Sequence, residues 1–178
     1  KKEAMLHMFD QSCVALIYGS AGTGKSTLIN HLSHYFAANS KLFLAQTNPA
    51  VDNLKRKVTA ADSEYMTIAK FIKRSNIRTE YDVLVIDECS TVSNKDMWQV
   101  LQKAQFKILI LVGDTYQISA IRFGNWFSVA RAFIPETAVF ELTKPYRTSD
   151  TGLLTLWERV RAMDDLSLIH ISEPTRRT

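Results

Sequence analysis

Cysteine, glycine and proline are all scarce in this chain. Its 178 residues include two cysteines, six glycines and four prolines. Two cysteines cannot form a disulfide framework or a four-cysteine zinc site, so we expect a protein of the reducing cytoplasm. The low glycine and proline content excludes a low-complexity or collagen-like chain.

Long apolar runs are missing as well. Uninterrupted apolar runs such as residues 108–112 fall far short of the roughly 18 residues that a membrane-spanning helix needs. The first residues, Lys1-Lys2-Glu3, contain neither an initiator Met nor the apolar core of a secretory signal. We therefore expect a soluble protein with no membrane partner, and a chain that starts inside a longer one.

The overall balance of residues is that of an ordinary globular domain. Hydrophobic residues make up 46% of the chain and charged residues 22%. The formal net charge of +4 permits nucleic acid as a partner but does not require it.

The last residues differ from the rest. Residues 166–176, which follow a helical pattern, have no helical or strand period of their own. This string resembles a translated transposase adaptor from sequencing libraries. We therefore interpret residues 166–178 as a non-native tail and residues 1–165 as the domain; an ordinary C-terminal peptide is the alternative.

Short apolar stretches alternate with amphipathic ones along the chain. The apolar stretches predict strands at residues 14–18, 41–46, 81–86, 107–112 and 137–142. Helical patterns lie at residues 28–36, from Pro49 to Val58, at 96–104 and at 153–160. Because the strands are apolar on both faces, this alternation predicts an α/β fold of three layers with a mainly parallel central sheet.

A phosphate-binding loop follows the first predicted strand. Residues 19–26 match the pattern G-x-x-x-x-G-K-[ST], between a buried strand and a helix. Glycines let backbone N–H groups approach phosphate oxygens, and the helix N-terminus adds its positive dipole. We expect the lysine to reach the β- and γ-phosphates of ATP and the serine to bind Mg²⁺. The expected nucleotide-binding residues are Gly19, Ser20, Ala21, Gly22, Thr23, Gly24, Lys25, Ser26 and Thr27.

Two carboxylates follow the third predicted strand. Asp87 and Glu88 come directly after residues 83–86, at the strand end where open α/β sheets bind ligands. We expect Asp87 to hold Mg²⁺ and Glu88 to orient or deprotonate an attacking water. A solvated strand end is the alternative, which the neighbouring phosphate loop disfavours. We expect Cys89, beside the pair, to be a packing residue.

Further segments resemble the motifs of superfamily 1 helicases, in family order. The segments are residues 44–54 for motif Ia, Asp87-Glu88-Cys89-Ser90 for motif II, residues 111–118 with the box Gly113-Asp114-x-x-Gln117 for motif III, and Leu142-Thr143-Lys144-Pro145-Tyr146-Arg147 for motif IV. Together with the phosphate loop, they resemble a three-layer P-loop NTPase fold. The resemblance covers residues 2–163 and is nearest to the RecD-like and UvrD-like DNA helicases. It implies a RecA-like motor domain that couples ATP hydrolysis to movement along single-stranded DNA.

The resemblance also implies roles for individual residues. Gln117 would sense the γ-phosphate or the attacking water, and Arg147 would contact the γ-phosphate from the far edge of the cleft. The implied catalytic residues are thus Lys25, Asp87, Glu88, Gln117 and Arg147. The implied nucleic-acid residues are Thr47, Asn48 and Thr67 on DNA phosphates and Phe71 near a base. The segment 67–71 departs from the family, because Ala69 stands where many relatives have His.

Some family parts are not present in this chain. The Gln of the adenine-reading motif would lie just before Lys1, and motifs V and VI would lie beyond residue 165, with the second RecA-like domain and its arginine finger. We therefore expect a domain that is incomplete at both ends and nearly inactive alone.

Weaker signals concern charge and aromatic residues. Basic clusters at residues 55–57 and 70–78 could follow a DNA backbone or simply be solvated helix faces. We expect Trp126 and Phe127 to pack in the core rather than stack on a base. His31 and His34 lack partners at metal-ligand spacing, so we assign them no metal role.

Three other functions stay open at this point. The chain could come from an RNA-directed helicase of the same superfamily, which the motifs separate poorly from a DNA helicase. It could be a P-loop kinase or an ATP-binding switch without motor activity, although such a protein has no use for the helicase motifs. It could also be a non-functional gene fragment.

Overall fold

The computed structural model describes residues 9, 12–20, 22–114 and 126–142. All of them belong to one compact unit that spans Lys1–Pro145. Within these ranges, no helix combines the length and the apolar character needed to cross a bilayer. The helix expected at residues 153–160 and the tail at 166–178 lie outside the described residues.

The centre of the unit is an all-parallel sheet of six strands in the order β3-β2-β4-β5-β1-β6. The strands are β1 (Val14–Gly19), β2 (Lys41–Ala45), β3 (Ser63–Thr67), β4 (Glu80–Ile86), β5 (Gln105–Gly113) and β6 (Val139–Leu142). Strands β1, β2 and β4 are buried almost throughout, as strands covered on both faces must be. The expected α/β fold with a parallel sheet is confirmed.

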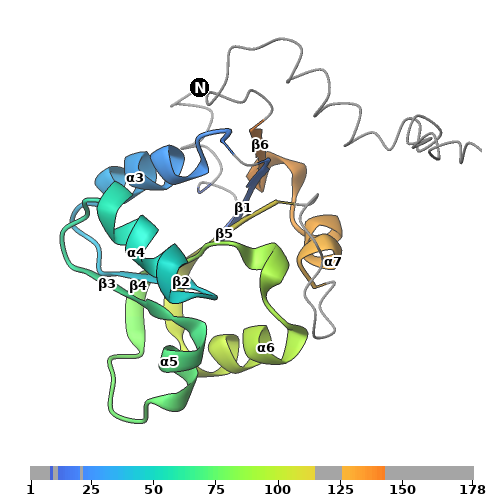
Figure 1. Ribbon diagram of the computed structural model, residues 1–178. Helices are drawn as coiled ribbons and strands as arrows, with labels where there is room; N and C mark the ends of the chain where they lie inside the picture. The colour runs from blue at the N-terminus through green and yellow to red at the C-terminus, as the bar shows by residue number, and fades with distance from the viewer. Residues whose placement is uncertain (1–8, 10–11, 21, 115–125, 143–178) are drawn as a thin grey trace, which may run out of the picture. The chain divides into compact units, whose positions relative to one another are not determined.

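Helices cover both faces of this sheet. They are α3 (Lys25–Tyr35), α4 (Asn48–Lys57), α5 (Ile68–Lys73), α6 (Asn94–Lys103) and α7 (Trp126–Phe133), with 3-10 turns η1 (Cys89–Thr91) and η2 (Glu136–Ala138). Figure 1 shows α3 beside α4 and α5 beside α6, and the buried clusters assign the two pairs to opposite faces. Because side chains alternate along β1, Ile17 packs beneath α3 and α4, while Leu16 joins the cluster of α5, α6 and α7.

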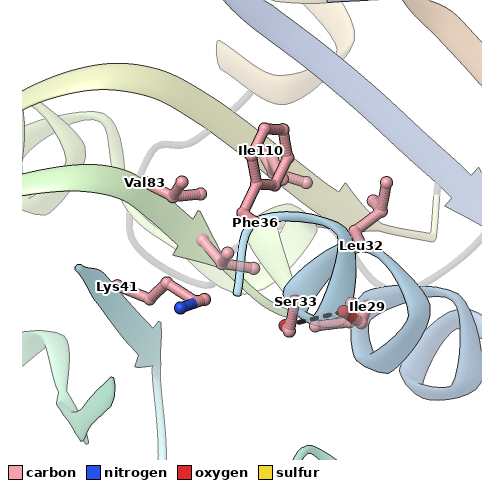
Figure 2. Close-up of a pocket in the computed structure, with 8 residues that line it drawn as sticks. Ile29, Leu32, Ser33, Phe36, Lys41, Val83 and Ile110 are labelled. Atoms are coloured by element: carbon pink, nitrogen blue, oxygen red, sulfur yellow. Dashed lines mark hydrogen bonds between the residues drawn. The ribbon is translucent and has the colours of Figure 1, made fainter. Parts of the chain in front are cut away.

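The seam between α3 and the sheet is apolar except at one end. Figure 2 shows Ile29, Leu32 and Phe36 of this helix region together with the sheet residues Val83 and Ile110, all of them buried. The Ser33 hydroxyl, also in this seam, donates to the carbonyl of Ile29 at 2.8 Å, which satisfies it within the helix.

Lys41 lies at the end of this interface between α3 and the sheet. It is only 1% exposed, although its side chain carries a charged group. Its ammonium donates to the carbonyl oxygens of Asn39 and Ala61, the latter at 3.0 Å. Burial lowers the pKa of Lys41, and the carboxylates of Asp62 and Asp82 oppose this effect. The buried charge is therefore tolerated because backbone oxygens and nearby acids replace water.

The elements expected at residues 14–18, 41–46, 81–86, 96–104 and 107–112 are all present, with bounds shifted by a few residues. The last expected strand, 137–142, is shorter, because Glu136–Ala138 forms η2 before β6 begins. Strand β3 and helices α5 and α7 were not expected. Strand β3 lies at the sheet edge with a mixed polar sequence, and α5 has only six residues, so neither gives a clear apolar period.

Candidate nucleotide site

The register of the parallel strands gathers several polar segments at one edge of the sheet. Tyr18 pairs with Gly113, Leu111 pairs with Ile86, and Ile86 pairs with Leu44. The residues that follow β1, β4, β5 and β2 therefore lie side by side, as the carboxyl ends of parallel strands must. Within the described residues, these are the phosphate loop, the acidic pair, Gly113 and Asp114 of the segment that resembles motif III, and the segment that resembles motif Ia.

The phosphate loop requires glycine at specific positions. Gly22 and Gly24 have φ angles of 82° and 90°, in the left-handed region that residues with a Cβ avoid. Gly24 is the N-cap of α3, and no acidic residue occupies the first turn of this helix. The helix N-terminus therefore keeps its positive dipole for an anion. Ala21 lies outside the described residues.

Hydrogen bonds hold the loop against the end of β1. Thr23 donates to the carbonyl of Ser20 twice, from its hydroxyl at 2.7 Å and from its backbone N–H at 3.3 Å. The ammonium of Lys25 donates to the carbonyls of Gly19 at 2.5 Å and Ser20 at 3.0 Å. Lys25 is therefore held on the loop backbone, at the base of the helix whose first turn also contains Ser26 and the exposed Thr27.

The two carboxylates differ in environment. Asp87 is 7% exposed, and burial raises its pKa to about 6, helped by the neighbouring carboxylate of Glu88. The N–H of Glu88, which donates to Asp87 at 2.9 Å, and the ammonium groups of Lys25 and Lys57 oppose this rise in the pKa. A buried carboxylate with a raised pKa is short of positive charge, and a divalent cation would supply it.

Glu88 has a backbone conformation that residues with a side chain rarely adopt. Its φ is 54°, a left-handed conformation at the N-cap of η1. Two hydrogen bonds from Thr91, through its N–H at 2.9 Å and its hydroxyl at 2.8 Å, reach the Glu88 carbonyl and hold this turn. Such backbone strain is frequent where a functional side chain must be aimed.

The donors at this edge fit Mg²⁺ in kind. Ser26 offers a hydroxyl and Asp87 a carboxylate, which are the hard oxygen ligands that Mg²⁺ prefers. Among the described residues, no group of three or more His, Cys, Asp or Glu side chains is placed to hold a metal ion. Mg²⁺ commonly takes one or two side-chain oxygens and completes its shell with water and phosphate oxygens, which is compatible with Ser26 and Asp87 as its protein ligands.

Three further polar side chains lie at this edge, and only Ser20 among them was expected from the sequence to bind the nucleotide. Asp114, at the end of β5, is 5% exposed. The hydroxyl of Ser20 and the amide oxygen of Gln46 are buried and accept or donate no hydrogen bond within the described part of the chain. The sequence signal for Gln46 and Asp114 was a polar residue directly after a buried strand. Both residues lie inside the segments that resemble motifs Ia and III.

The residues expected to touch nucleic acid lie at the ends of neighbouring strands. Thr47 is the N-cap of α4, and its hydroxyl accepts from the N–H of Ala50 at 3.3 Å. Thr67 caps α5 in the same way, accepting from Lys70 at 3.2 Å. Because Thr67 pairs with Ala45 at the end of β2, the two capped helices begin close together. Thr47 and Asn48 are exposed, and Thr67 is half-buried.

Phe71 corrects one expectation. The side chain was expected near a base, but it is 0% exposed and packs in the core cluster on the α5 and α6 face. The ammonium of Lys103 lies 5.2 Å from its ring centroid. A fully buried ring cannot stack on a base, so its role here is to anchor α5 to the sheet.

Other expectations on single residues have clear outcomes. Cys89 is fully buried and its thiol donates to the carbonyl of Ile86 at 3.0 Å, as expected of a packing residue. Phe127 is 4% exposed, and the indole of Trp126 donates to the carbonyl of Val92 at 2.8 Å, which confirms packing for both. Gln117 and Arg147 lie outside the described residues, so their roles stay predictions.

Comparison with known proteins gives a family match. The family model described as AAA domain matches residues 1–173. The replicase polyproteins 1ab of Bat coronavirus 512/2005 and Bat coronavirus HKU9 each match 60% of the chain, with 27% sequence identity. The chain spans only 2% of the length of these relatives.

Solved structures with a similar fold include several Pif1 helicases. A Bacteroides Pif1 bound to ssDNA matches 93% of this chain with a TM-score of 0.65 at 17% identity. A Bacteroides Pif1 in complex with ADP-AlF4 matches 94% with a TM-score of 0.60 at 17% identity. Pif1 helicase from Candida albicans matches 90% with a TM-score of 0.59 at 21% identity.

In each of these matches the chain covers less than half of the Pif1 chain, between 43% and 47%. The similarity extends over nearly all of the present chain, between 90% and 94% of it. The chain belongs to the AAA domain family, and it shares the RecA-like α/β fold of the Pif1 helicases that it matches.

Proposed function

We propose that this chain is the ATP-binding motor domain of a DNA helicase, which couples ATP hydrolysis to movement on single-stranded DNA. The observation that supports this most is the meeting of the phosphate loop with a buried Asp87 and a strained Glu88 at one sheet edge. A similar fold in Pif1 helicases, one bound to ssDNA and one to ADP-AlF4, supports the same reading.

The residues at this edge have separate roles in the proposed binding and hydrolysis of ATP. Backbone N–H groups of the loop and the first turn of α3 bind phosphate oxygens, and the ammonium of Lys25, which the loop carbonyls hold beside them, contacts the phosphates as well. Ser26 and Asp87 would hold Mg²⁺, which when bound would neutralise the charge that develops on the phosphates. Glu88 accepts the proton of the attacking water, and its left-handed backbone fixes the direction of its side chain.

The first test measures nucleotide binding. Calorimetry with MgADP and MgATP should detect binding to the chain, and Lys25→Ala should abolish it because the ammonium that contacts the phosphates is lost. Lys95→Ala, at an exposed lysine of α6, is the matched control and should bind as the wild type does. EDTA should weaken binding of the wild type if Mg²⁺ is part of the site. Equal affinities for the wild type and Lys25→Ala would overturn the assignment.

The nucleic-acid interface is proposed at the ends of β2 and β3. There the first turns of α4 and α5 lie close together and carry Thr47, Asn48 and Thr67. Exposed basic side chains follow in both helices, at residues 55–57 and at Lys70 and Lys73. Backbone N–H groups and cations of this kind bind phosphates without reading sequence.

A second test measures this binding. Fluorescence anisotropy with single-stranded DNA should give weak affinity that falls steeply with salt, because phosphate contacts release counterions. Asn48→Ala should weaken binding several-fold, whereas Gln102→Ala, at an exposed side-chain amide of α6 outside both basic clusters, should not. A matched RNA strand separates the alternatives: tighter binding to RNA would favour the RNA-directed helicase, and no binding to either strand would favour the non-motor ATPase switch or kinase.

A further inference from the structure

Tyr18 joins three elements directly before the phosphate loop. Its ring is 4% exposed, and its hydroxyl donates to a carboxylate oxygen of Glu141 on β6 at 2.9 Å. The same hydroxyl accepts from Arg131 of α7 at 2.8 Å, and the guanidinium lies over the Tyr18 ring at 4.5 Å from its centroid. The hydroxyl of Tyr18 therefore links the end of strand β1 to strand β6 and to helix α7.

Strand β6 also contacts the next residue of the chain. Tyr18 pairs with Glu141 and Gly19 pairs with Leu142 in the parallel ladder. A Cβ on Gly19 would lie 2.6 Å from the carbonyl oxygen of Leu142 and 2.8 Å from the hydroxyl oxygen of Thr23. The end of β6 is thus packed against the beginning of the loop, with no room for a side chain between them.

Helix α7 is attached to the same edge at two places. One turn before Arg131, the ring of Phe127 packs on Gly113, where an added Cβ would lie 2.5 Å from the ring. Gly113 ends β5 and pairs with Tyr18. Phe127 and Arg131, four residues apart, lie on one face of α7 and contact the ends of β5 and β1.

We propose that Tyr18 is a positioning residue for the nucleotide site, which holds the phosphate loop in place through its hydroxyl. This inference rests on the proposed nucleotide binding. The Gly19 carbonyl that follows Tyr18 accepts the ammonium of Lys25 at 2.5 Å, so the position of the strand end sets the position of the loop lysine. Glu141 and Arg131 both hold that strand end through one oxygen atom, the Tyr18 hydroxyl.

The hydroxyl matters because the loop must be ordered before phosphate binds. A loop that is free to shift loses part of the binding free energy to ordering. Loss of one hydrogen-bonding group with charged partners should therefore weaken nucleotide affinity by about threefold to tenfold. The ring itself keeps its packing and its contact with the guanidinium.

The experiment compares tyrosine hydroxyls in the same sheet. Tyr18→Phe removes the hydroxyl before the loop, and Tyr65→Phe removes one on β3 that donates to the carbonyl of Val58 at 2.9 Å. Affinity for MgADP is measured by calorimetry, and stability by urea unfolding, for both variants. We expect both to lose some stability and only Tyr18→Phe to lose nucleotide affinity.

A second pair of variants tests the same link from the exposed side. Arg131→Met removes the donor to the Tyr18 hydroxyl but keeps the aliphatic stem, and Arg131→Lys restores a donor. Because Arg131 is exposed, neither change should prevent folding. We expect weaker MgADP binding for Arg131→Met and recovery for Arg131→Lys.

The outcomes separate this inference from the proposed function. If the wild type does not bind MgADP, the proposed function fails. If the wild type binds, and Tyr18→Phe and Arg131→Met bind with the same affinity as the wild type or as Tyr65→Phe, the positioning role is wrong and the hydroxyl only contributes stability.

Discussion

A carboxylate at the end of a buried strand meets two opposed requirements. Asp87 must be ionised to hold a cation, yet it lies in an environment that disfavours charge and raises its pKa to about 6. In the protein without nucleotide, the ionised form therefore costs folding free energy. Burial of Asp87 therefore lowers the stability of the folded chain at a residue that the proposed Mg²⁺ site needs.

This cost predicts a pH-dependent gain for Asp87→Asn. The folded pKa lies above the unfolded value of 3.8, so the cost is complete above about pH 6 and vanishes below about pH 4. We expect the substitution to stabilise the nucleotide-free chain by about 1–3 kcal/mol at pH 8 and by almost nothing at pH 3.5. Urea unfolding of both proteins in EDTA at the two pH values measures this difference.

Asp52→Asn is the control for that experiment, since Asp52 is exposed on α4. It should not change stability in a pH-dependent way of this size. An Asp87→Asn variant that is as stable as the wild type at pH 8 would show that Asp87 is not penalised by burial.

At the scale of elements, single contacts determine how helices attach to the sheet. Helix α7 attaches where the Phe127 ring meets Gly113 at the end of β5. Gly113 is therefore required because of this contact with Phe127. Its backbone conformation in the strand is one that any residue could adopt.

Gly113→Ala should destabilise the chain by about 1–3 kcal/mol, because the added methyl group overlaps the Phe127 ring. Phe127→Leu, measured in the same urea experiment, shortens the partner side chain. The double variant should be less destabilised than the sum of the single variants, since the smaller side chain makes room for the methyl group. Simple additivity would show that the close contact does not cause the loss.

Helix α5 depends on one lysine from a neighbouring helix. The ammonium of Lys103, in the last turn of α6, donates to the carbonyls of Phe71 at 2.5 Å and Ile72 at 3.1 Å, and also to the carbonyl of Arg74. These carbonyls lie at the C-terminal end of α5, where a helix leaves its acceptors without partners.

Lys103→Met should cost about 1–2 kcal/mol of stability and make α5 exchange its amide hydrogens faster than the rest of the sheet. Lys73→Met, at an exposed lysine of α5 itself, is the control and should have little effect. Hydrogen exchange measured by mass spectrometry reports on both. Unchanged protection of residues 68–73 in Lys103→Met would contradict the proposed attachment.

At the scale of the whole molecule, the decisive property is coupling between ATP and nucleic acid. The chain spans about half of the Pif1 chains that it matches. The resemblance to superfamily 1 helicases implies a second RecA-like domain that supplies an arginine finger, and such a finger contributes orders of magnitude in rate. We therefore expect the chain alone to hydrolyse ATP very slowly.

A longer protein that contains the downstream domain should hydrolyse ATP faster when single-stranded DNA is added. In that protein, Glu88→Gln should stop hydrolysis and keep ATP binding, because the group that accepts the proton of water is lost while the phosphate loop is unchanged. A coupled ATPase assay with and without DNA measures the effect. Equal rates with DNA, with RNA and without either would favour the non-motor switch.

Much of this molecule could be predicted from short segments of sequence. The loop at residues 19–26 and the pair Asp87 and Glu88 are local patterns, and each needs only the strand before it to be placed correctly. Apolar runs identified most of these strands because parallel strands covered on both faces must be apolar throughout. The fold class follows from the same runs.

Other features depended on contacts between residues far apart in the chain. Phe71 looked like a base-stacking residue by its position in a motif, but packing against the sheet buried it completely. The junction of Tyr18 with Arg131 and Glu141 joins residues more than 110 positions apart, which no local period reveals.

The sequence by itself determined the chemistry of the nucleotide site, because a phosphate loop and two acids at strand ends are encoded within a few consecutive residues. Only the tertiary structure decided which side chains support that site. Burial, strand register and the close approach of β6 and α7 depend on the whole sheet, so the raised pKa of Asp87 and the bonds of Tyr18 appear only once the chain is folded.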